Sequence, residues 1–507
     1  MKLSNVDNLK TINFLLLLKK RTMLKLLSNL PIEDLTQEND YIGIIEKGNL
    51  LKSFFLTNKD DFSKIKIFSI YGEWGSGKST LMKYLKKELK GTFNTFFFEA
   101  WEFESDKNLS LSLLEFLVEE RKTDAQKIGD ELFEIGSKLL EGFAKSITFK
   151  TPILNFSADK LLTTIEEENP KTFLQLKKDF KTSFSTWEDK ITTKNKSKDK
   201  LPEYNIVFID DLDRCEPENV LNLLSAIKLL FTYGKKTIFL CGIDKKAVKE
   251  AVKNKYGDVV KANEYLEKIF DISFTMPNNL NICKLVQYYF KNEIVCINNN
   301  DEDLYNLITL FFTKLHFTNP RRIKKILNKY VIIKNLIANN TDKKLKLPNI
   351  IHKEEGTLFE TYLTLYLLIL KEFEPEIYDN LFNLSVKKAN YQKSLNENYS
   401  EVSQKREAEN SIYHNFQDNL LKERFCQINN PKIELLIPFF SPIKVDNINT
   451  SAFYNKDTFK NIFNVKQKTY EYYFTLFLYD NKSLILKDLE YSDYTLLDYK
   501  EMIANII

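Results

Sequence analysis

The stretch IKIFSIYGEWGSGKSTLMKYL, residues 65–85, constrains the fold of this chain more than any other. Its centre, Gly72–Ser79, fits the pattern G-x-x-x-x-G-K-[ST]. Residues 64–71 are β-branched and aromatic, which is typical of a buried strand, and residues 79–89 carry apolar side chains at helical spacing. The chain has 13 glycines, and three of them fall between positions 72 and 77. Strand, glycine turn and helix therefore follow one another as in a phosphate-binding loop.

The residue types of this loop suit a nucleoside triphosphate. Glycines let successive main-chain N–H groups converge on phosphate oxygens, and the following helix adds the positive end of its dipole. Lys78 can reach the β- and γ-phosphates, and the Ser79 hydroxyl can ligate Mg²⁺. The alternative is a glycine turn that only joins a strand to a helix, with a solvated lysine. The residues expected to bind the nucleotide here are Gly72, Glu73, Trp74, Gly75, Ser76, Gly77, Lys78, Ser79 and Thr80.

A magnesium nucleotide also requires a carboxylate, and the segment YNIVFIDDLDRC (204–215) supplies candidates. Residues 206–209 form an apolar strand run, so Asp210 and Asp211 follow at the carboxyl edge of what we expect to be a neighbouring parallel strand. We expect Asp210 to bind Mg²⁺, directly or through water, and Asp211 to polarise the attacking water. A purely structural pair is the alternative, although paired acids are costly without a compensating cation.

Arg214 lies in the same segment, and arginine is scarce in this chain. Its planar guanidinium suits a γ-phosphate or a contact between subunits. A local salt bridge to Asp213 or Glu216 is the competing interpretation.

The segment KKTIFLCGID (235–244) is apolar and follows an expected helix at 217–231, so we interpret it as the next strand. Such a strand often ends in a polar sensor beside the γ-phosphate. Asp244 is the candidate for that sensor, and an ordinary helix cap is the alternative role.

The segment FTNPRRIKKILNKY (317–330) is strongly helical in pattern. Asn319 is a natural N-cap, and Pro320 suits the first helical position. A helix here can act as a lid that directs Arg321 or Arg322 back at the nucleotide. A solvated basic helix end is the alternative.

Taken together, six segments resemble the KAP family of P-loop NTPases in order and spacing: GEWGSGKST, FFFEAWEFES, IVFIDDLDRCEPENV, TIFLCGID, YLEKIF and NPRRIKKILN. The resemblance covers residues 36–335. It implies an α/β domain of the ASCE type, with a parallel sheet flanked by helices and a helical lid, which often works as an assembling switch in bacteria. Trp101 and Glu102 fall in the family's motif on the strand after the phosphate loop, where Glu99 replaces the usual asparagine.

Three regions are expected along the chain. Residues 1–35 form an N-terminal helical extension, residues 36–335 the nucleotide-binding domain, and residues 336–507 a mainly helical C-terminal domain without recognised chemistry. Many KAP proteins carry membrane helices between the phosphate loop and the acidic strand, but residues 106–200 of this chain are amphipathic and charged. We expect a soluble helical insertion that ends in the lysine-rich loop DKITTKNKSKDK (189–200).

Composition narrows the range of partners. The formal net charge is +4, from 74 basic and 70 acidic residues, so charge does not indicate a nucleic-acid partner, although it leaves one possible. No apolar run reaches the roughly 18 residues that a membrane helix needs. The five cysteines show no metal-binding spacing, so we expect a reducing compartment and a cytoplasmic protein. A homo-oligomer, or a partner protein bound through the C-terminal domain, is also expected.

The leading hypothesis is an ATPase with ATP and Mg²⁺ as its cofactors. Lys78 and Mg²⁺ neutralise developing charge while Asp211 orients water, and turnover drives a change in conformation or assembly. The family resemblance suggests bacterial defence against phage or mobile elements. A GTPase is less favoured because the N-K-x-D sequence at 58–61 precedes the phosphate loop. The alternatives are a nucleotide-gated scaffold with little turnover and a motor stimulated by nucleic acid, which oligomerisation and DNA- or RNA-stimulated hydrolysis would distinguish.

Overall fold

The computed structural model describes residues 26–106, 108–147, 173–193, 202–257, 262–277, 281–291, 293–297, 300–339 and 357–379, with short stretches between 469 and 504. The chain divides into two compact units. One is Leu30–Asn281, and the other combines Met1–Asn29 with Ile282–Ile507. Most of the expected N-terminal extension and most of the expected C-terminal domain lie outside the described residues.

A five-stranded parallel sheet forms the centre of unit Leu30–Asn281, in the order β2-β3-β4-β1-β5. The strands are apolar on both faces, as expected where helices cover a parallel sheet on each side. In β3, for example, Ile206 and Phe208 pack on one side and Val207 and Ile209 on the other. The strand bounds are β1 Ile67–Tyr71, β2 Phe93–Glu99, β3 Tyr204–Asp210, β4 Thr237–Ile243 and β5 Ile272–Thr275.

The order of the strands corrects one expectation. The strand that ends in Asp210 does not neighbour the strand before the phosphate loop, because β4 pairs with both β1 and β3 and lies between them. All five strands run parallel, so their carboxyl ends still meet at one edge of the sheet.

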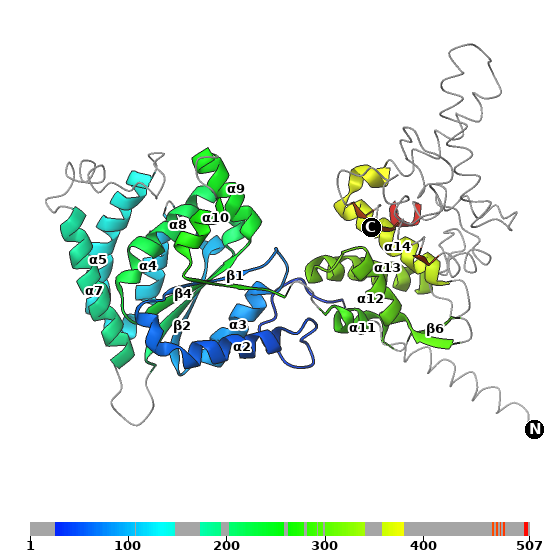
Figure 1. Cartoon of the computed structure of the whole chain (residues 1–507), viewed down its shortest axis with the longest axis horizontal. Coiled ribbons are helices and arrows are strands. Elements are labelled where there is room, and N and C mark those ends of the chain that lie inside the picture. The colour runs from blue at the N-terminus through cyan, green and yellow to red at the C-terminus, as the bar shows by residue number, and fades with distance from the viewer. Residues whose placement is uncertain are drawn as a thin grey trace, which may run out of the picture. The chain divides into compact units, whose positions relative to one another are not determined.

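Helices cover both faces of the sheet (Figure 1). Helices α2 (Ile44–Thr57) and α3 (Lys78–Leu89) pack on one face through residues such as Phe55 and Leu85. The other face is covered by α4 (Leu109–Glu119), α8 (Pro217–Leu229), α9 (Lys245–Tyr256) and α10 (Ala262–Ile269). Short 3₁₀ turns join several elements: η1 Lys59–Ser63, η2 Ala100–Phe103, η4 Leu212–Arg214 and η5 Phe231–Tyr233.

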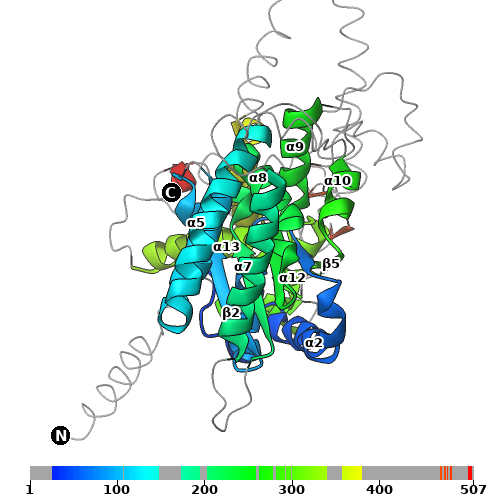
Figure 2. The same ribbon diagram turned by 90° about the vertical axis from the view of Figure 1, so that its left-hand side faces the viewer.

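The expected insertion is helical where the structure describes it. Two long helices, α5 (Lys122–Ile147) and α7 (Phe173–Thr193), lie side by side at one end of the sheet (Figures 1 and 2). Phe180 and Phe184 of α7 pack against Phe231, which joins the insertion to the main core. Because α7 continues to Thr193, the start of the expected lysine-rich loop is helical, and residues 194–200 lie outside the described residues.

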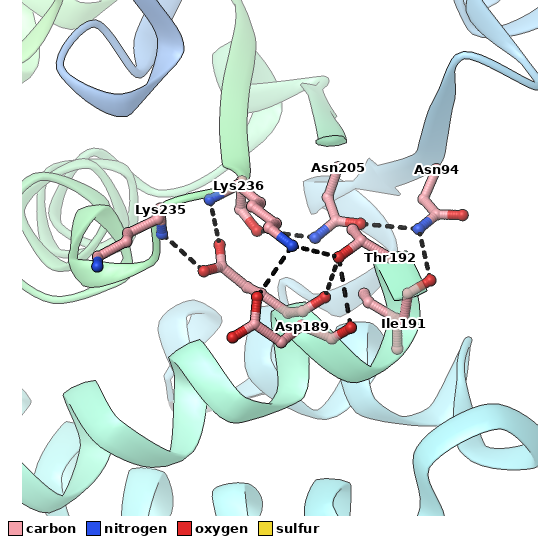
Figure 3. A network of polar contacts seen from close by, with 9 residues as sticks. Asn94, Asp189, Ile191, Thr192, Asn205, Lys235 and Lys236 are labelled. Atoms are coloured by element: carbon pink, nitrogen blue, oxygen red, sulfur yellow. Dashed lines mark hydrogen bonds and ion pairs between the residues drawn. The ribbon is translucent and has the colours of Figure 1, made fainter. Parts of the chain in front are cut away.

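Polar side chains fasten the end of α7 to the amino-terminal edge of the sheet, as Figure 3 shows. The Asn94 amide on β2 donates to Ile191 O at 3.2 Å and to Asn205 Oδ1 at 2.9 Å. The Asn205 amide on β3 donates in turn to Thr237 Oγ1 on β4 at 3.1 Å. Three strands and one helix are thereby joined in a chain of buried hydrogen bonds.

Glu188 of α7 completes this network. Its carboxylate accepts the main-chain N–H groups of Lys235 at 2.7 Å and Lys236 at 3.2 Å, just before β4. The Lys236 ammonium donates to Thr192 Oγ1 at 3.1 Å and pairs with Asp189 at 2.9 Å (Figure 3). Glu188 is only 1% exposed, so these bonds replace the water that the carboxylate has lost.

The other unit is mainly helical in its described residues. Asn319 caps α13 by accepting from the N–H groups of Arg321 at 3.1 Å and Arg322 at 3.2 Å, as predicted, and Pro320 is the first helical residue. Helix α14 (Thr357–Phe373) is apolar in sequence and is buried along most of its length. The bounds are α11 Cys283–Phe290, antiparallel strands β6 Ile294–Ile297 and β7 Asn300–Asp303, α12 Leu304–Lys314, α13 Pro320–Asn339 and α14 Thr357–Phe373.

Among the described helices of both units, none has the length and the apolar character that crossing a bilayer requires.

Candidate functional site

The phosphate loop lies between the end of β1 and the start of α3, where the sequence predicted it. Gly75 and Gly77 have φ angles of 82° and 99°, a conformation that other residues adopt only with strain. The turn is closed by a hydrogen bond from Ser76 N to Glu73 O at 3.1 Å. The sequence therefore places its glycines where the backbone needs them.

Two polar side chains of the loop are buried but differ in their partners. Lys78 is 6% exposed, and its ammonium donates to Gly72 O at 2.8 Å and to Glu73 O at 3.2 Å, so it crosses the inside of the turn. The Ser76 hydroxyl is buried and has no hydrogen-bond partner among the described residues. A buried polar group without a partner is costly, and a phosphate oxygen is a ligand that would satisfy this one.

Asp210 ends β3 with its carboxylate next to the phosphate loop. The Ser79 hydroxyl and Lys78 lie close enough to this carboxylate to favour its charged form. Asp210 is 2% exposed, and burial raises the pKa of its carboxyl group against the opposing effects of Ser79, the Asp211 N–H and Lys78. A serine hydroxyl beside a carboxylate is a donor set of hard oxygens, which fits Mg²⁺.

The intervening strand β4 leaves room for Asp210 because it carries a glycine at this point. A methyl group added at Gly242 would lie 3.0 Å from Asp210 Oδ1 and 3.0 Å from the sulfur of Met82. A side chain at position 242 would therefore crowd the acid that faces the loop. Sequence reasoning missed Gly242, and the scarcity of glycine in this chain was the signal that could have found it.

Asp211 directly follows the strand in an unusual conformation. Its φ is 57°, in the left-handed region that non-glycine residues rarely occupy and that often marks a functional position. Burial, the neighbouring charge of Asp210 and other acids raise the pKa of Asp211 to about 6, and Arg214 opposes that rise. The carboxylate of Asp211 therefore lies half-buried at the sheet edge, and its pKa is close to neutral pH.

Arg214 pairs with Asp211, and not with Asp213 or Glu216 as the alternative interpretation had it. The two groups lie 3.1 Å apart, and the guanidinium also lies over the Trp101 ring at 5.2 Å from the ring centre. The left-handed backbone at Asp211 turns the chain into η4, which brings the arginine back toward that carboxylate.

Asp244 connects the end of β4 to the phosphate loop. One carboxylate oxygen accepts from Lys246 N at 2.9 Å and so caps α9, which is one of the two roles expected for it. The other oxygen accepts from Trp74 N in the phosphate loop at 3.2 Å. Lys246 adds an exposed ion pair with Glu73 at 2.8 Å. The loop is therefore tied to the first turn of α9.

Two glutamates near the site were not among the predicted site residues. Glu99, at the end of β2, is in register with Asp210 and pairs with Lys83 at 3.4 Å. Glu104 accepts from Glu216 N at 2.7 Å and so braces the loop that follows Asp211. The motif EAWEFES indicates that this region is near the site, but it does not predict the partners of Glu99 and Glu104.

Arg321 and Arg322 lie at the start of α13, in the other unit, so their approach to the nucleotide stays a prediction. Within that unit the Arg322 guanidinium donates to Tyr470 OH at 3.1 Å and lies over the Phe373 ring at 5.1 Å from its centre.

The chain matches one family model and is similar to two known proteins. The model of the KAP family P-loop domain matches residues 55–337. The chain is also similar to two proteins of the archaeon Methanocaldococcus jannaschii. It is 37% identical to uncharacterized protein MJ0181 over 115 residues, which are 21% of this chain and 44% of that protein. It is 31% identical to uncharacterized protein MJ0182 over 177 residues, 29% of this chain and 88% of that protein. The chain thus spans less than half of the first relative and most of the second.

Proposed function

This chain belongs to the KAP family of P-loop domains, a nucleotide-binding NTPase family, and we propose that it binds and hydrolyses ATP with Mg²⁺. The observation that carries the proposal is the grouping of Lys78, Ser79 and Asp210 at one edge of the sheet, beside a buried Ser76 hydroxyl without a partner among the described residues. These groups are the complement of a triphosphate and its metal ion.

The main-chain N–H groups of residues 75–80 would bind the phosphates, and the positive end of the α3 dipole would favour their charge. The Lys78 ammonium would exchange its two carbonyl partners for β- and γ-phosphate oxygens. Ser79 and Asp210 would hold Mg²⁺, which when bound neutralises charge on the phosphates. Asp244 would keep the loop in place through its bond to Trp74 N.

Asp211 would accept a hydrogen bond from the attacking water, because it follows the metal-binding position at the same sheet edge. Its ion pair with Arg214 at 3.1 Å competes with that role. The proposal therefore includes slow basal turnover, which rises when Arg214 leaves Asp211 for the γ-phosphate or for another subunit. Arg321 or Arg322 would supply further positive charge if the helical lid closes.

Turnover would change the conformation or the assembly of the protein, with a second copy or a partner protein bound through the C-terminal region. A cytoplasmic role in defence against phage or mobile elements is part of this proposal. Its support is the family's frequent use as an assembling switch, since the two matched relatives are uncharacterized.

The test is phosphate release from ATP and GTP by the purified chain and by Lys78→Ala and Asp211→Asn, with Mg²⁺ and with EDTA. We expect Mg²⁺-dependent ATP turnover that falls at least about 100-fold in both variants. Size-exclusion profiles in each nucleotide state would report assembly.

Nucleotide binding without turnover, even with DNA or RNA added, would contradict hydrolysis and favour the nucleotide-gated scaffold. Turnover that appears only with nucleic acid would favour the motor instead. Equal turnover in the wild type and Lys78→Ala would place the activity outside this site.

A further inference from the structure

Residues 32–44 lie along the first turn of α3, beside the phosphate loop. The N–H of Ile32 donates to Thr80 Oγ1 at 3.2 Å. A methyl group added at Gly77 would lie 2.9 Å from Ile44 Cδ1 and 3.2 Å from Ile42 Cδ1. An apolar wall therefore borders the loop at Gly77.

The two ends of a bound triphosphate must lie on different sides of this loop. The γ-phosphate has to face Asp210 and Asp211, where the metal ion and the attacking water are proposed. The α-phosphate, which carries the nucleoside, then lies at the first turn of α3 near Thr80. The sugar and base would leave the loop on that side, where Ile32 contacts Thr80 and where Ile42 and Ile44 lie against the nearby residue Gly77.

The turn before α2 leaves main-chain polar groups unpaired at this point. Asp40 is 5% exposed, and its two oxygens accept the N–H groups of Ile44 at 2.8 Å and Ile45 at 2.9 Å. Ile42 lies between Asp40 and Ile44 in the sequence. Neither its N–H nor its C=O forms a hydrogen bond within the described part of the chain. Ile42 is partly buried, so an outside partner for these two groups would be worth more than at a fully exposed position.

We infer that Ile42 is the nucleobase-recognition residue of this site, and that it selects a 6-aminopurine. This inference rests on the proposed function, whose phosphate site it extends. The Ile42 side chain contacts one face of the base, its N–H donates to the ring nitrogen N1, and its C=O accepts from the 6-amino group.

Asp40 gives the reason why adenine suits this place better than guanine. Guanine presents an N1–H and a 2-amino group, which need acceptors such as a carboxylate. Each oxygen of Asp40 already accepts one main-chain N–H of α2, and only 5% of the residue is exposed, so little of this carboxylate is left for guanine. Adenine presents one amino group and one ring acceptor on the same edge, and the C=O and N–H of one residue provide a partner for each.

The test uses analogues of ATP on the wild-type chain, in competition with a fluorescent ATP analogue in Mg²⁺. Purine riboside triphosphate lacks the 6-amino group, and 1-deaza-ATP lacks the N1 acceptor. We expect each to bind about tenfold more weakly than ATP, because one hydrogen bond is lost and its protein partner stays buried. The control, 7-deaza-ATP, alters a ring nitrogen outside the proposed contact and should bind within about twofold of ATP.

A pair of variants separates the main chain from the side chain. Ile42→Pro removes the N–H, so ATP and 1-deaza-ATP should then bind equally. Ile42→Ala keeps the N–H and should keep the tenfold preference for ATP over 1-deaza-ATP, with weaker binding of both. The analogue series on the wild type stands without these variants if Ile42→Pro fails to fold.

Tripolyphosphate distinguishes failure of the inference from failure of the proposed function. If ATP binds no more tightly than tripolyphosphate, or if all the purine analogues bind equally, base recognition by Ile42 is wrong and the phosphate site stands. If neither ATP nor tripolyphosphate binds, the proposed function fails and the inference fails with it.

Discussion

Buried polar side chains lie at both edges of the central sheet, but they are paired differently at each. At the amino-terminal edge, Asn94 and Asn205 form hydrogen bonds that connect three strands and helix α7 (Figure 3). Glu188 of α7 accepts from the main chain just before β4. At the carboxyl edge, the Ser76 hydroxyl has no partner among the described residues, and Asp211 has a φ of 57°.

The difference assigns different tasks to the two edges. A satisfied buried network stabilises the fold and fixes which elements pack together. Unsatisfied or strained groups lower stability and persist where a ligand later satisfies them. We therefore expect substitutions at the amino-terminal edge to change folding, and substitutions at the carboxyl edge to change nucleotide chemistry.

Asp210→Asn should show the largest difference between its effect on phosphate release and its effect on stability. Phosphate release should fall at least about 100-fold, since the charge that we propose binds Mg²⁺ is lost. The free energy of unfolding without nucleotide should stay equal or rise, because burial raises the pKa of Asp210 and its charge is costly in the apo fold. Phosphate release and urea unfolding measure the two. A loss of more than about 1 kcal/mol in stability would mean that this edge also holds the fold together.

Glu188→Ala should show the reverse. It removes the buried acceptor of the part-buried N–H groups of Lys235 and Lys236, so we expect the free energy of unfolding to fall by about 3 kcal/mol. Phosphate release per folded molecule should not change. Glu131→Ala, at an exposed position of α5, is the matched control and should alter stability by no more than about 0.5 kcal/mol. If the two variants lost the same free energy of unfolding, the Glu188 hydrogen bonds would not stabilise the fold.

Asp271 also lies at the amino-terminal edge of the sheet, where its carboxylate accepts from the start of β1. Because a carboxylate titrates, this residue extends the comparison to the effect of pH. Its carboxylate accepts from Lys66 N at 2.9 Å, Ile67 N at 3.0 Å and the Lys228 ammonium at 2.8 Å. Burial alone would raise its pKa, but these hydrogen bonds hold the pKa below the ordinary value of 3.8. The resulting stability is present above the unfolded pKa and is lost as pH falls through the folded pKa.

We therefore expect Asp271→Ala to cost about 2 kcal/mol at pH 7, and this cost to shrink as pH falls below about 4. Urea unfolding of both proteins across that range measures it. A cost that stays constant to pH 3 would show that the side chain acts by packing and not by its charge.

Asp244→Ala should give the smallest effect on activity, because Asp244 holds the main chain of the phosphate loop and is not proposed to contact the phosphates or the metal ion. Losing its bond to Trp74 N should raise the KM for ATP about fivefold with little change in kcat, and losing the α9 cap should cost about 1 kcal/mol of stability. Asp244→Asn retains an acceptor and should recover part of both. An unchanged KM in Asp244→Ala would mean that the loop holds its shape without this bond.

Local patterns predicted the parts of this fold that are local. The glycines at positions 72–77 require left-handed backbone, and Asn319 with Pro320 marks a helix start by short-range hydrogen bonding. The strand that ends in Asp210 was evident from its continuous apolar run. Each of these signals is contained in a few consecutive residues, which is why the sequence alone was sufficient.

The rest depends on which distant segments meet. Strand order is set by long-range packing, so the position of β4 between β1 and β3 could not be read from any one segment. The Glu188 network joins residues 47 and 48 positions apart, and its acid looks like any surface glutamate on an amphipathic helix. Arg214 pairs with Asp211 because the backbone at Asp211 is left-handed. This conformation could not be predicted from the sequence, since position 211 is not a glycine.

The most direct test of the central claim is the unfolding midpoint of the full chain with and without Mg²⁺ and a non-hydrolysable ATP analogue. At about 100 times the dissociation constant, binding to the carboxyl edge should stabilise the fold by about 2.7 kcal/mol in the wild type and in Glu188→Ala. The same ligand should leave Lys78→Ala unchanged. Equal stabilisation of Lys78→Ala, or none in the wild type, would contradict the assignment of the nucleotide site to this edge.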